Sequence, residues 1–516
     1  MSESGLGSPA AVSTPSRLSL FLDRAGLQGF PWVSAIVLYT ISWGWLLVVG
    51  NSYWSTDWEG YAIPELTTFD FGTLGLAPWI NTYVLIHDIF GAFAMRMLIF
   101  LFYFMASVFL FGILKEFKFV SFWQKKFIVI FFLILPFNTA KIALMVFHYS
   151  VAYFLFFFAW YCLTLPDSFL RRAVSTIAFF LSFSMHSLLF FFAIPIYLDW
   201  TIKHRLQKLT FLQWIKRNLF LLSLPLLYLV LRNNFWPETI SYHNLSKVSV
   251  VMPFVILVVP SFLFLVYALS NRDSAKSRSN ERKMISFGLA TIFLGLLPYI
   301  LYGFFKLNSR LPLDYLIVLF GRTSWYTRHQ TLQPLGASFF LVGLISLAKS
   351  NKRLLNTDYL ASGAIFACLI LNLGFGLEHK VDYEKQKRVV QSLKSVGHSD
   401  LLVNYVFIDQ ATSINARGQV MYERAWSGLI WQAYGLGEAT TIKIGTNCSV
   451  GKRSRLVLIQ GPETHWQALK NWVRDRDMGF KVIIDDMPGA CKPEMVTAEK
   501  VSGTIPILFY FTGAQN

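Results

Sequence analysis

Two carboxylates stand close together in an aromatic segment near the start of the chain. The segment reads Tyr53-Trp54-Ser55-Thr56-Asp57-Trp58-Glu59-Gly60-Tyr61, so a single residue, Trp58, separates Asp57 from Glu59. A carboxylate beside a substrate hydroxyl can act as its general base, and aromatic rings offer flat faces for a sugar. The same residue types also form ordinary interfacial loops, in which Trp and Tyr belong to an aromatic belt. Both interpretations are open on this segment alone.

A second segment combines cations with aromatic rings, and its members are Arg322, Trp325, Tyr326, Arg328 and His329. The planar guanidinium of arginine binds a phosphate group through two hydrogen bonds. Arg322 and Arg328 are therefore the candidates for holding a phosphate leaving group, and Arg96 is a further candidate. His186 is a candidate catalytic residue, although a histidine in an apolar run can equally be a satisfied core residue.

Long apolar runs surround these segments and must position them. The chain has 516 residues, of which 54% are hydrophobic and 49 are phenylalanine, a composition typical of a polytopic membrane protein. The net charge of +17 is concentrated in short loops between apolar runs, which indicates orientation signals rather than nucleic-acid binding. The runs are Pro31–Gly50, Met95–Leu114, Phe127–Phe137, Ile142–Leu165, Ala173–Leu198, Leu219–Leu231, Val248–Leu269, Ile285–Phe305, Leu335–Ala348 and Tyr359–Leu377.

The basic loops predict how the chain is threaded. Residues 1–24 are polar and are expected to form a disordered cytoplasmic tail, followed by a transmembrane domain over 25–378. A single pass over Ala173–Leu198 would place the basic loop from Lys203 to Arg217 outside, against the positive-inside bias. We therefore expect two short passes with an outer turn near Ser184–Ser187. This gives about 11 spans and an extracytoplasmic C-terminus.

Residues 379–516 are more polar and alternate between strand and helix patterns, which predicts a small α/β extracytoplasmic domain. The expected strands are Leu401–Ile408, Leu456–Gln460, Lys481–Asp485 and Ile505–Phe511, and the expected helices are Gln386–Val396, Val420–Tyr434 and Thr464–Asp475. Cys448 and Cys491 are candidates for a disulfide in an oxidising compartment, or they are two free thiols. Asp409 is expected to be a surface or capping residue.

With this topology the candidate residues collect on the outer face. The first loop carries Asp57 and Glu59, and later His87 and Asp88, while Lys141 and His148 lie in the outer part of a span. Charged groups at membrane depth are costly and commonly mark a site. The sequence contains no phosphate-binding P-loop, dinucleotide fingerprint, zinc-protease motif or nucleophile elbow.

The arrangement resembles two groups of bacterial membrane enzymes. Thr56-Asp57-Trp58-Glu59 in the first outer loop resembles the acidic loop motif of the GT-C superfamily of glycosyltransferases, many of which also carry a C-terminal extracytoplasmic domain. Phe137-Asn138-Thr139-Ala140-Lys141 and the segment around Ser184-Met185-His186-Ser187 are similar to segments of O-antigen and exopolysaccharide polymerases.

The resemblance implies an enzyme of the bacterial inner membrane that transfers a polyprenyl-phosphate-linked sugar or oligosaccharide at the periplasmic face. Asp57 would be the base. A divalent metal ion is left open as a cofactor, as are other polysaccharide-assembly proteins as partners. Two other functions remain open: a flippase or transporter of lipid-linked glycans, and a membrane acyltransferase using His148 or His186.

Overall fold

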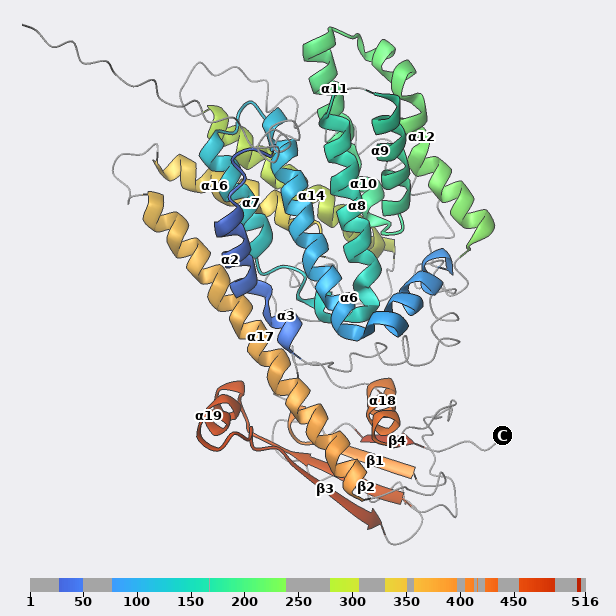
Figure 1. Ribbon diagram of the computed structural model, residues 1–516, viewed down its shortest axis with the longest axis vertical. Coiled ribbons are helices and arrows are strands. Elements are labelled where there is room, and N and C mark those ends of the chain that lie inside the picture. Colours follow the sequence, from blue (N-terminus) through green and yellow to red (C-terminus); the bar gives the residue numbers. More distant parts are fainter. Residues whose placement is uncertain are drawn as a thin grey trace, which may run out of the picture.

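The computed structural model describes residues 27–49, 77–166, 168–237, 279–305, 330–349, 357–396, 404–412, 415, 423–434, 454–487 and 508–511. A bundle of helices stands above a small α/β domain, and one long helix joins them (Figure 1). The bundle contains α2 (Trp32–Trp43), α3 (Trp45–Val48), α6 (Ala77–Ile113), α7 (Phe122–Ile134), α8 (Phe147–Thr164), α9 (Phe169–Ser182), α10 (Ser187–Phe191), α11 (Ala193–Gln207), α12 (Phe211–Phe235), α14 (Ser279–Phe305) and α16 (Gln333–Lys349). Three short 3-10 turns are η1 (Leu114–Glu116), η2 (Thr139–Ile142) and η3 (Leu144–Val146).

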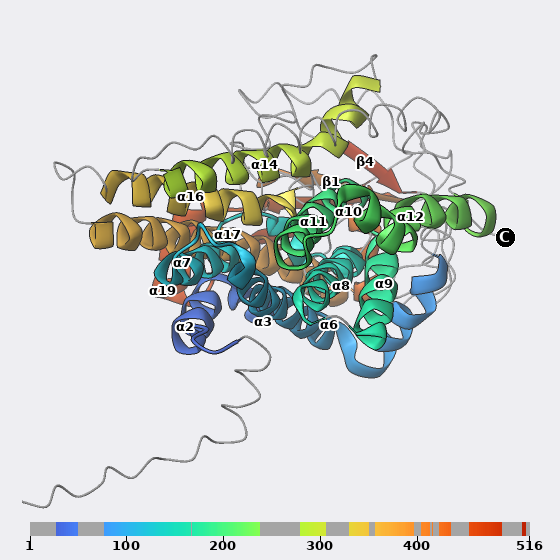
Figure 2. The ribbon, with the colours of Figure 1, turned by 90° about the horizontal axis from the view of Figure 1, so that it is seen from above.

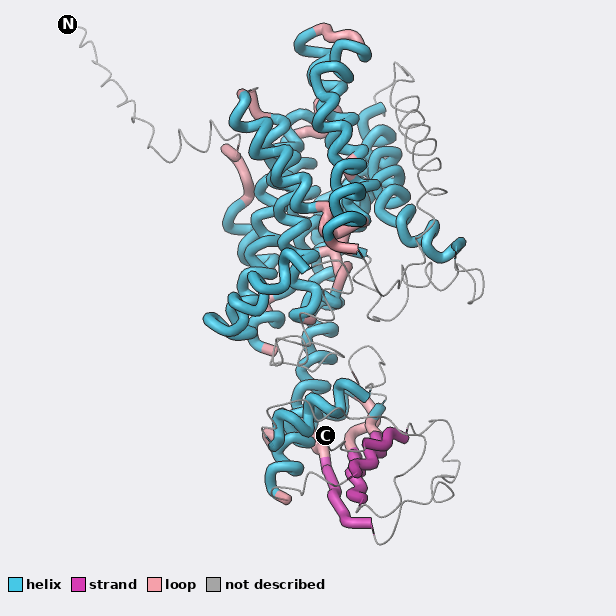
Figure 3. Tube along the Cα trace, turned by 90° about the vertical axis from the view of Figure 1, so that its right-hand side faces the viewer, coloured by secondary structure: helices cyan, strands magenta, loops and turns pink. Residues whose placement is uncertain are grey.

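The joining helix is α17 (Thr357–Ser395). Its 39 residues give a length of about 58 Å, enough to cross a hydrocarbon core of about 30 Å and continue beyond it. Figure 3 shows the same stacking of bundle and sheet from the side. The expected domain boundary between residues 378 and 379 therefore falls inside one continuous helix.

Four stretches of helix in the described part of the chain are long and apolar enough to cross a membrane: Asn81–Glu116, Phe147–Thr164, Phe211–Phe235 and Asp358–Ser395. Trp32–Trp43 and Gln333–Ala348 are shorter apolar helices. These are the features of a helical membrane protein. The expected number of about 11 spans stays a prediction, since Val248–Leu269 lies outside the described residues.

Contacts between helix ends define two opposite ends of the bundle. Gln124 near the start of α7 donates to the hydroxyl of Ser346 near the end of α16, at 2.9 Å. At the other end, Asn138 follows α7 and donates to Thr331, which precedes α16, at 2.9 Å. We call the first end, where the basic loop between α6 and α7 also lies, the basic end. The second is the domain end, because α17 leaves the bundle there.

Glycines allow α14 and α16 to pack backbone to backbone. A Cβ on Gly288 would lie 2.6 Å from the backbone nitrogen of Phe340, and one on Gly336 would lie 2.6 Å from that of Ile292. Seen from above, α14 and α16 run obliquely across the bundle, whereas α7, α8 and α9 are viewed nearly end-on (Figure 2). The missing side chains thus permit a close antiparallel crossing.

The apolar run Ala173–Leu198 is broken where the charge pattern predicted. Helix α9 ends at Ser182, a tight turn follows, and α11 begins at Ala193 after the short α10. The turn is held by backbone hydrogen bonds such as Met185 N–H to the Ser182 carbonyl, at 3.1 Å. Lys203 of α11 returns to the same recess as Arg171 at the start of α9. The chain therefore makes the expected helical hairpin.

The α/β domain has a four-stranded sheet in the order β3-β2-β1-β4. Its elements are β1 (Asn404–Asp409), α18 (Glu423–Tyr434), β2 (Ser454–Gln460), α19 (His465–Asp475), β3 (Lys481–Met487) and β4 (Leu508–Phe511). Strands β1 and β2 are parallel, with Phe407 opposite Val457, and the two outer pairs are antiparallel. Side chains from α17, α18 and the two central strands form one core. The expected strands and two of the expected helices are present, with ends that differ by a few residues. The third expected helix, Gln386–Val396, is the last part of α17, which begins at Thr357.

Candidate functional site

The chain is not α-helical between α7 and α8, although this segment is buried. Asn138 adopts a left-handed backbone conformation, with φ of 51°, and the short turn Thr139–Ile142 follows it. Pro136 cannot donate a backbone hydrogen bond, and asparagine is one of the few residues that tolerate the left-handed region. Irregular backbone at membrane depth occurs where protein buries it or where it lines a cavity. The break between α7 and α8 is therefore enclosed by the bundle and is part of its structure.

Asn138 connects three parts of the bundle. Its Nδ2 donates to the hydroxyl of Tyr103 on α6 at 2.7 Å and to the hydroxyl of Thr331 before α16 at 2.9 Å. Its backbone N–H donates to the side-chain carbonyl of Gln330 at 3.4 Å. The side chain is only 3% exposed, so these hydrogen bonds form away from water. They hold the broken segment against α6 and the start of α16.

Lys141 is a buried basic residue in the same segment. It is 4% exposed, and its Nζ lies 3.0 Å from the ring centroid of Trp43 and 5.0 Å from that of Tyr103. An ammonium over aromatic rings is attracted by their negative faces. Trp43 is itself held in place, because its Nε1 donates to the Leu133 carbonyl at 2.9 Å. The amino group of Lys141 is therefore fixed in position.

A small recess brings these groups together, and its polar lining consists of Tyr39, Tyr103, Asn138, Lys141, Tyr153 and Thr331. The hydroxyl of Tyr153 has no hydrogen-bond partner among the described residues. The recess thus offers one amino group and several hydroxyl and amide groups. The recess has room for about one water molecule, so this donor set suits a water molecule or part of a larger group that reaches in from outside.

Arg96 lies in α6 and contacts the residue that precedes the predicted carboxylate loop. It is 5% exposed, and its Nη1 donates to the Val49 carbonyl at 2.7 Å. Val49 follows α3 and is the last described residue before the segment that contains Asp57. Arg96 is therefore buried within the bundle and is not a lipid-facing flank residue.

A sharp bend in α6 precedes Arg96. Gly91 has φ of 73°, which favours glycine, and no atom lies within 4 Å of the position of a Cβ there. The bend separates the arm from Ala77 to Phe90, and Tyr83 of this arm packs on Phe147 at 5.1 Å between ring centroids. His87 and Asp88 therefore belong to a helix, whereas the sequence led us to expect a loop. Apolar residues of this arm pack against the bundle core, which favours helix over loop.

His186 lies in the turn between α9 and α11, as expected. It is half-buried, and its ring centroid is 6.2 Å from that of Tyr228 on α12. Arg96 contacts a different part of the bundle from His186, because it lies on α6 and donates to the Val49 carbonyl next to α3. Asp57, Trp58, Glu59, Arg322, Trp325, Tyr326, Arg328, His329, Cys448 and Cys491 lie outside the described residues.

The sequence places Lys141 on the outer face among other charged residues, but it gives neither Lys141 nor Asn138 a role in the site. The sequence signal for these two residues is an amide side chain and a charged side chain that follow Pro136 within five positions, inside an otherwise apolar stretch. Within the described part of the chain, no group of three His, Cys, Asp or Glu is arranged for a metal ion. The divalent metal ion therefore stays an open prediction.

The recess and the α/β domain lie at the same end of the bundle. On α17, Asn372 donates to the Ile134 carbonyl at 2.6 Å and to Ser42, and the ring of His379 stacks on Trp45 at 5.2 Å. The helix then enters the α/β domain (Figure 1).

Inside that domain, Lys385 is fully buried and forms an ion pair with Asp409 at 2.8 Å. It also hydrogen-bonds Asn415. The other oxygen of Asp409 accepts the Ala411 N–H at 3.0 Å in the turn after β1. Asp409 is buried, so the expectation of a surface residue is wrong. Because Lys385 belongs to α17, its contacts with Asp409 and Asn415 fix the α/β domain to that helix.

No family model, curated protein or solved structure matches this chain. The fold itself defines its class as a helical membrane protein with an attached α/β domain.

Proposed function

We propose that this protein is a membrane glycosyltransferase or polysaccharide polymerase that uses a polyprenyl-phosphate-linked sugar. In the reaction, Asp57 accepts the proton of an acceptor hydroxyl, and the hydroxyl oxygen bonds to the anomeric carbon. The bond from that carbon to the phosphate oxygen breaks, and the polyprenyl phosphate or diphosphate leaves as an anion. Glu59 orients Asp57 or binds the sugar, and Arg322 and Arg328 stabilise the leaving phosphate.

One observation carries the proposal: described residues that directly flank the two predicted loops in the sequence, Val49 and Gln330, are both hydrogen-bonded to residues of the bundle. Arg96 binds Val49, which leads into the Asp57 segment, and Asn138 binds Gln330 and Thr331, which directly follow His329. The buried recess with Lys141 lies beside the second anchor. This arrangement supports a shared site in which the amino group of Lys141 adds a hydrogen-bond donor to those of the two arginines.

The distribution of charge supports an extracytoplasmic location for the site. Basic residues flank the helix ends opposite the recess, including Lys115, Lys125, Arg171 and Lys203. Short basic loops favour the cytoplasmic side. On this proposal the recess and the α/β domain face the periplasm, where lipid-linked sugars are polymerised, and His329, Trp58, Trp325 and Tyr326 contribute to sugar and phosphate binding.

The test compares variants in a strain that lacks the native gene, with membrane levels of each protein matched by immunoblot. We expect Asp57→Asn to lower surface polysaccharide about 100-fold or more, because general-base catalysis contributes about 10²–10⁴ in rate. The matched control is Asp358→Asn, an exposed carboxylate at the basic end, on the first turn of α17. Polysaccharide should be unchanged in that strain.

A second measurement uses purified protein in nanodiscs with a radiolabelled polyprenyl-diphosphate oligosaccharide and follows release of the lipid phosphate. Lys141→Met should slow this release while the protein keeps its gel-filtration profile. Normal polysaccharide in the Asp57→Asn strain would refute the role of Asp57. Movement of intact lipid-linked glycan across the bilayer without release of lipid phosphate would refute the enzyme assignment and favour a flippase.

A further inference from the structure

Helix α19 of the α/β domain is amphipathic, and one of its apolar sides is exposed. The helix begins after Thr464, which caps its first turn, and Ala468 on its inner side is fully buried. Trp466 and Val473 lie seven residues apart and therefore share one side of the helix. They are 62% and 64% exposed. Two large apolar side chains on one exposed side mark a surface for an apolar partner.

The buried side of α19 packs on α17. Ala468 belongs to a cluster with Val381 of α17, and Leu377, one turn earlier on α17, packs against the same cluster. Between these two residues of α17, His379 stacks on Trp45 of α3, at 5.2 Å between ring centroids. Helix α19 therefore lies directly beside the point where α17 leaves the bundle (Figure 1).

The same side of α17 is apolar and exposed where the helix runs along the bundle. Phe366, Ile370 and Leu373 are all exposed. With Leu377 they are separated by four, three and four residues, so the four side chains form one stripe along the helix. An exposed apolar stripe on a helix that is long enough to cross a membrane faces lipid. Because α19 packs on Leu377, it lies at the end of this lipid-facing stripe.

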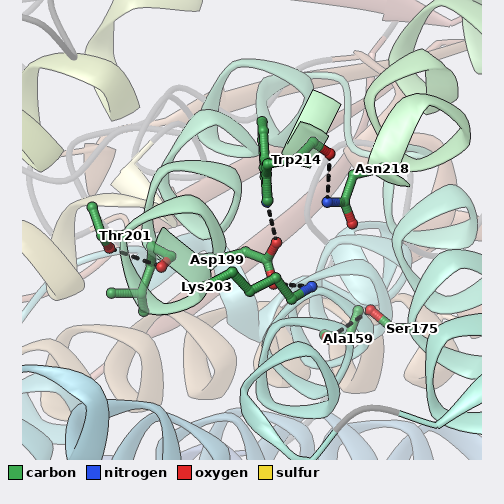
Figure 4. A network of polar contacts seen from close by, with 8 residues as sticks. Ala159, Ser175, Asp199, Thr201, Lys203, Trp214 and Asn218 are labelled. Carbon is green, nitrogen blue, oxygen red and sulfur yellow. Dashed lines mark hydrogen bonds and ion pairs between the residues drawn. The ribbon is translucent and has the colours of Figure 1, made fainter. Parts of the chain in front are cut away.

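The length of α17 places α19 at the edge of the hydrocarbon layer. Leu377 follows Thr357, the first residue of α17, by 20 residues, which corresponds to about 30 Å, the thickness of a hydrocarbon core. At the opposite, basic end, Lys203 pairs with Asp199 at 2.7 Å, and Nε1 of Trp214 donates to Asp199 at 2.8 Å (Figure 4). Ion pairs and tryptophans are typical of the boundary between lipid and water. Helix α19 therefore lies at the boundary on the domain end.

The tryptophans of α19 lie beside cations. Nζ of Lys470 is 5.7 Å from the ring centroid of Trp466, and the guanidinium carbon of Arg476 is 5.1 Å from that of Trp472. An indole ring at the level of the headgroups, with a long basic side chain that reaches towards water, is typical of a helix that lies in a membrane surface.

We propose that α19 docks on the surface of the phospholipid bilayer at the domain end, with Trp466 and Val473 in contact with the acyl chains just below the headgroups. Arg474 pairs with the neighbouring Asp475 at 2.8 Å, so part of the positive charge of the helix is balanced. Burial of apolar area, more than attraction to anionic headgroups, therefore supplies the affinity. The inference rests on the positions of α17 and α19 and does not depend on the proposed reaction.

The test replaces Trp466 or Val473, one at a time, by the photo-cross-linking residue p-benzoylphenylalanine in the full-length protein. Each variant is irradiated in nanodiscs of phosphatidylethanolamine and phosphatidylglycerol, and peptides from α19 are analysed by mass spectrometry. Both positions should give peptides that carry the mass of one phospholipid. The matched control position is Gln467, which is exposed on another side of the same helix and should give no more lipid adduct than a sample kept in the dark.

A second measurement keeps the cross-linker at Val473 and changes one more residue. Trp466→Asp puts a charge on the exposed apolar side and should abolish the lipid adduct, whereas Gln467→Asp should leave its yield unchanged. Gel filtration will confirm that each variant is folded. The adduct should also survive concentrated sodium chloride, because salt screens charges but does not weaken apolar burial.

Four results would overturn the proposal. The first is the absence of a lipid adduct at Trp466 and Val473, and the second is an equal yield at Gln467. The third is loss of the adduct in concentrated salt, which would mean that charge and not apolar burial holds the helix. The fourth is a cross-linked dimer of the protein in place of the lipid adduct, which would assign the apolar side of α19 to a second copy of the chain.

Discussion

Replacing Asn138 tests whether the break between α7 and α8 is stabilised as the structure indicates. Asn138→Ala removes two side-chain hydrogen bonds, to Tyr103 and Thr331, each contributing about 0.5–1.5 kcal/mol. It also places an alanine at φ of 51°, which costs about 1–2 kcal/mol. We expect a loss of about 2–5 kcal/mol in the free energy of unfolding. Asn138→Gly loses the same hydrogen bonds without the backbone cost, so it should be less destabilised by about 1–2 kcal/mol.

The assay is unfolding in mixed micelles of dodecyl maltoside and increasing SDS, followed by tryptophan fluorescence. The control is Asn234→Ala, in which an exposed asparagine near the end of α12 loses one hydrogen bond, to the Val230 carbonyl at 2.8 Å. This variant should stay within about 0.5 kcal/mol of wild type.

Two results would refute the reasoning. Equal stability of the Asn138→Ala and Asn138→Gly proteins would mean that the left-handed backbone at this position does not matter. A loss no larger than that of Asn234→Ala would mean that the buried hydrogen bonds do not stabilise the break. In the second case the anchor of Thr331, and with it the support for a shared site, would fail.

Two further predictions concern the connections of α17 and the crossing of α14 and α16. Lys385→Met leaves Asp409 buried without its cation and should cost about 3–5 kcal/mol, whereas Lys380→Met breaks a partly exposed pair on the same helix and should cost less than about 1 kcal/mol. Pulse proteolysis of the α/β domain in the full-length protein measures both, and equal losses would contradict the burial argument. Gly288→Ala puts a Cβ 2.6 Å from a backbone nitrogen of α16 and should cost about 1–3 kcal/mol. Gly363→Ala, which meets no atom within 4 Å, should be neutral or stabilising by up to about 1 kcal/mol in the same SDS titration, and a matching loss there would refute the close crossing.

Periodicity and charge in the sequence were enough to predict the class of fold. Apolar runs marked most of the helices, because a helix in lipid must be apolar over most of its length. The basic loop after Lys203 predicted the hairpin at Ser184–Ser187, and the structure contains it. The alternation of strand-like and helix-like segments after residue 378 predicted the α/β domain, because strands and helices differ in the local pattern of their apolar residues.

The candidate site was less accessible to such reasoning. Asp57, Glu59, Arg322 and Arg328 remain predictions from residue type, because they lie outside the described residues. Lys141 looked like one charged group among several on the outer face. Its location over Trp43 depends on residues almost 100 positions away, which no local pattern reveals.

The sequence by itself determined that the chain is a helical membrane protein with an α/β domain, because burial in lipid and strand pairing impose regular local patterns. Only the tertiary structure decided which polar residues share a recess. Asn138 meets Thr331 and Arg171 meets Lys203 through packing of distant helices, and such contacts leave no periodic trace in the chain. The bend at Gly91 likewise depends on the tertiary structure, because the arm before it packs on the bundle core.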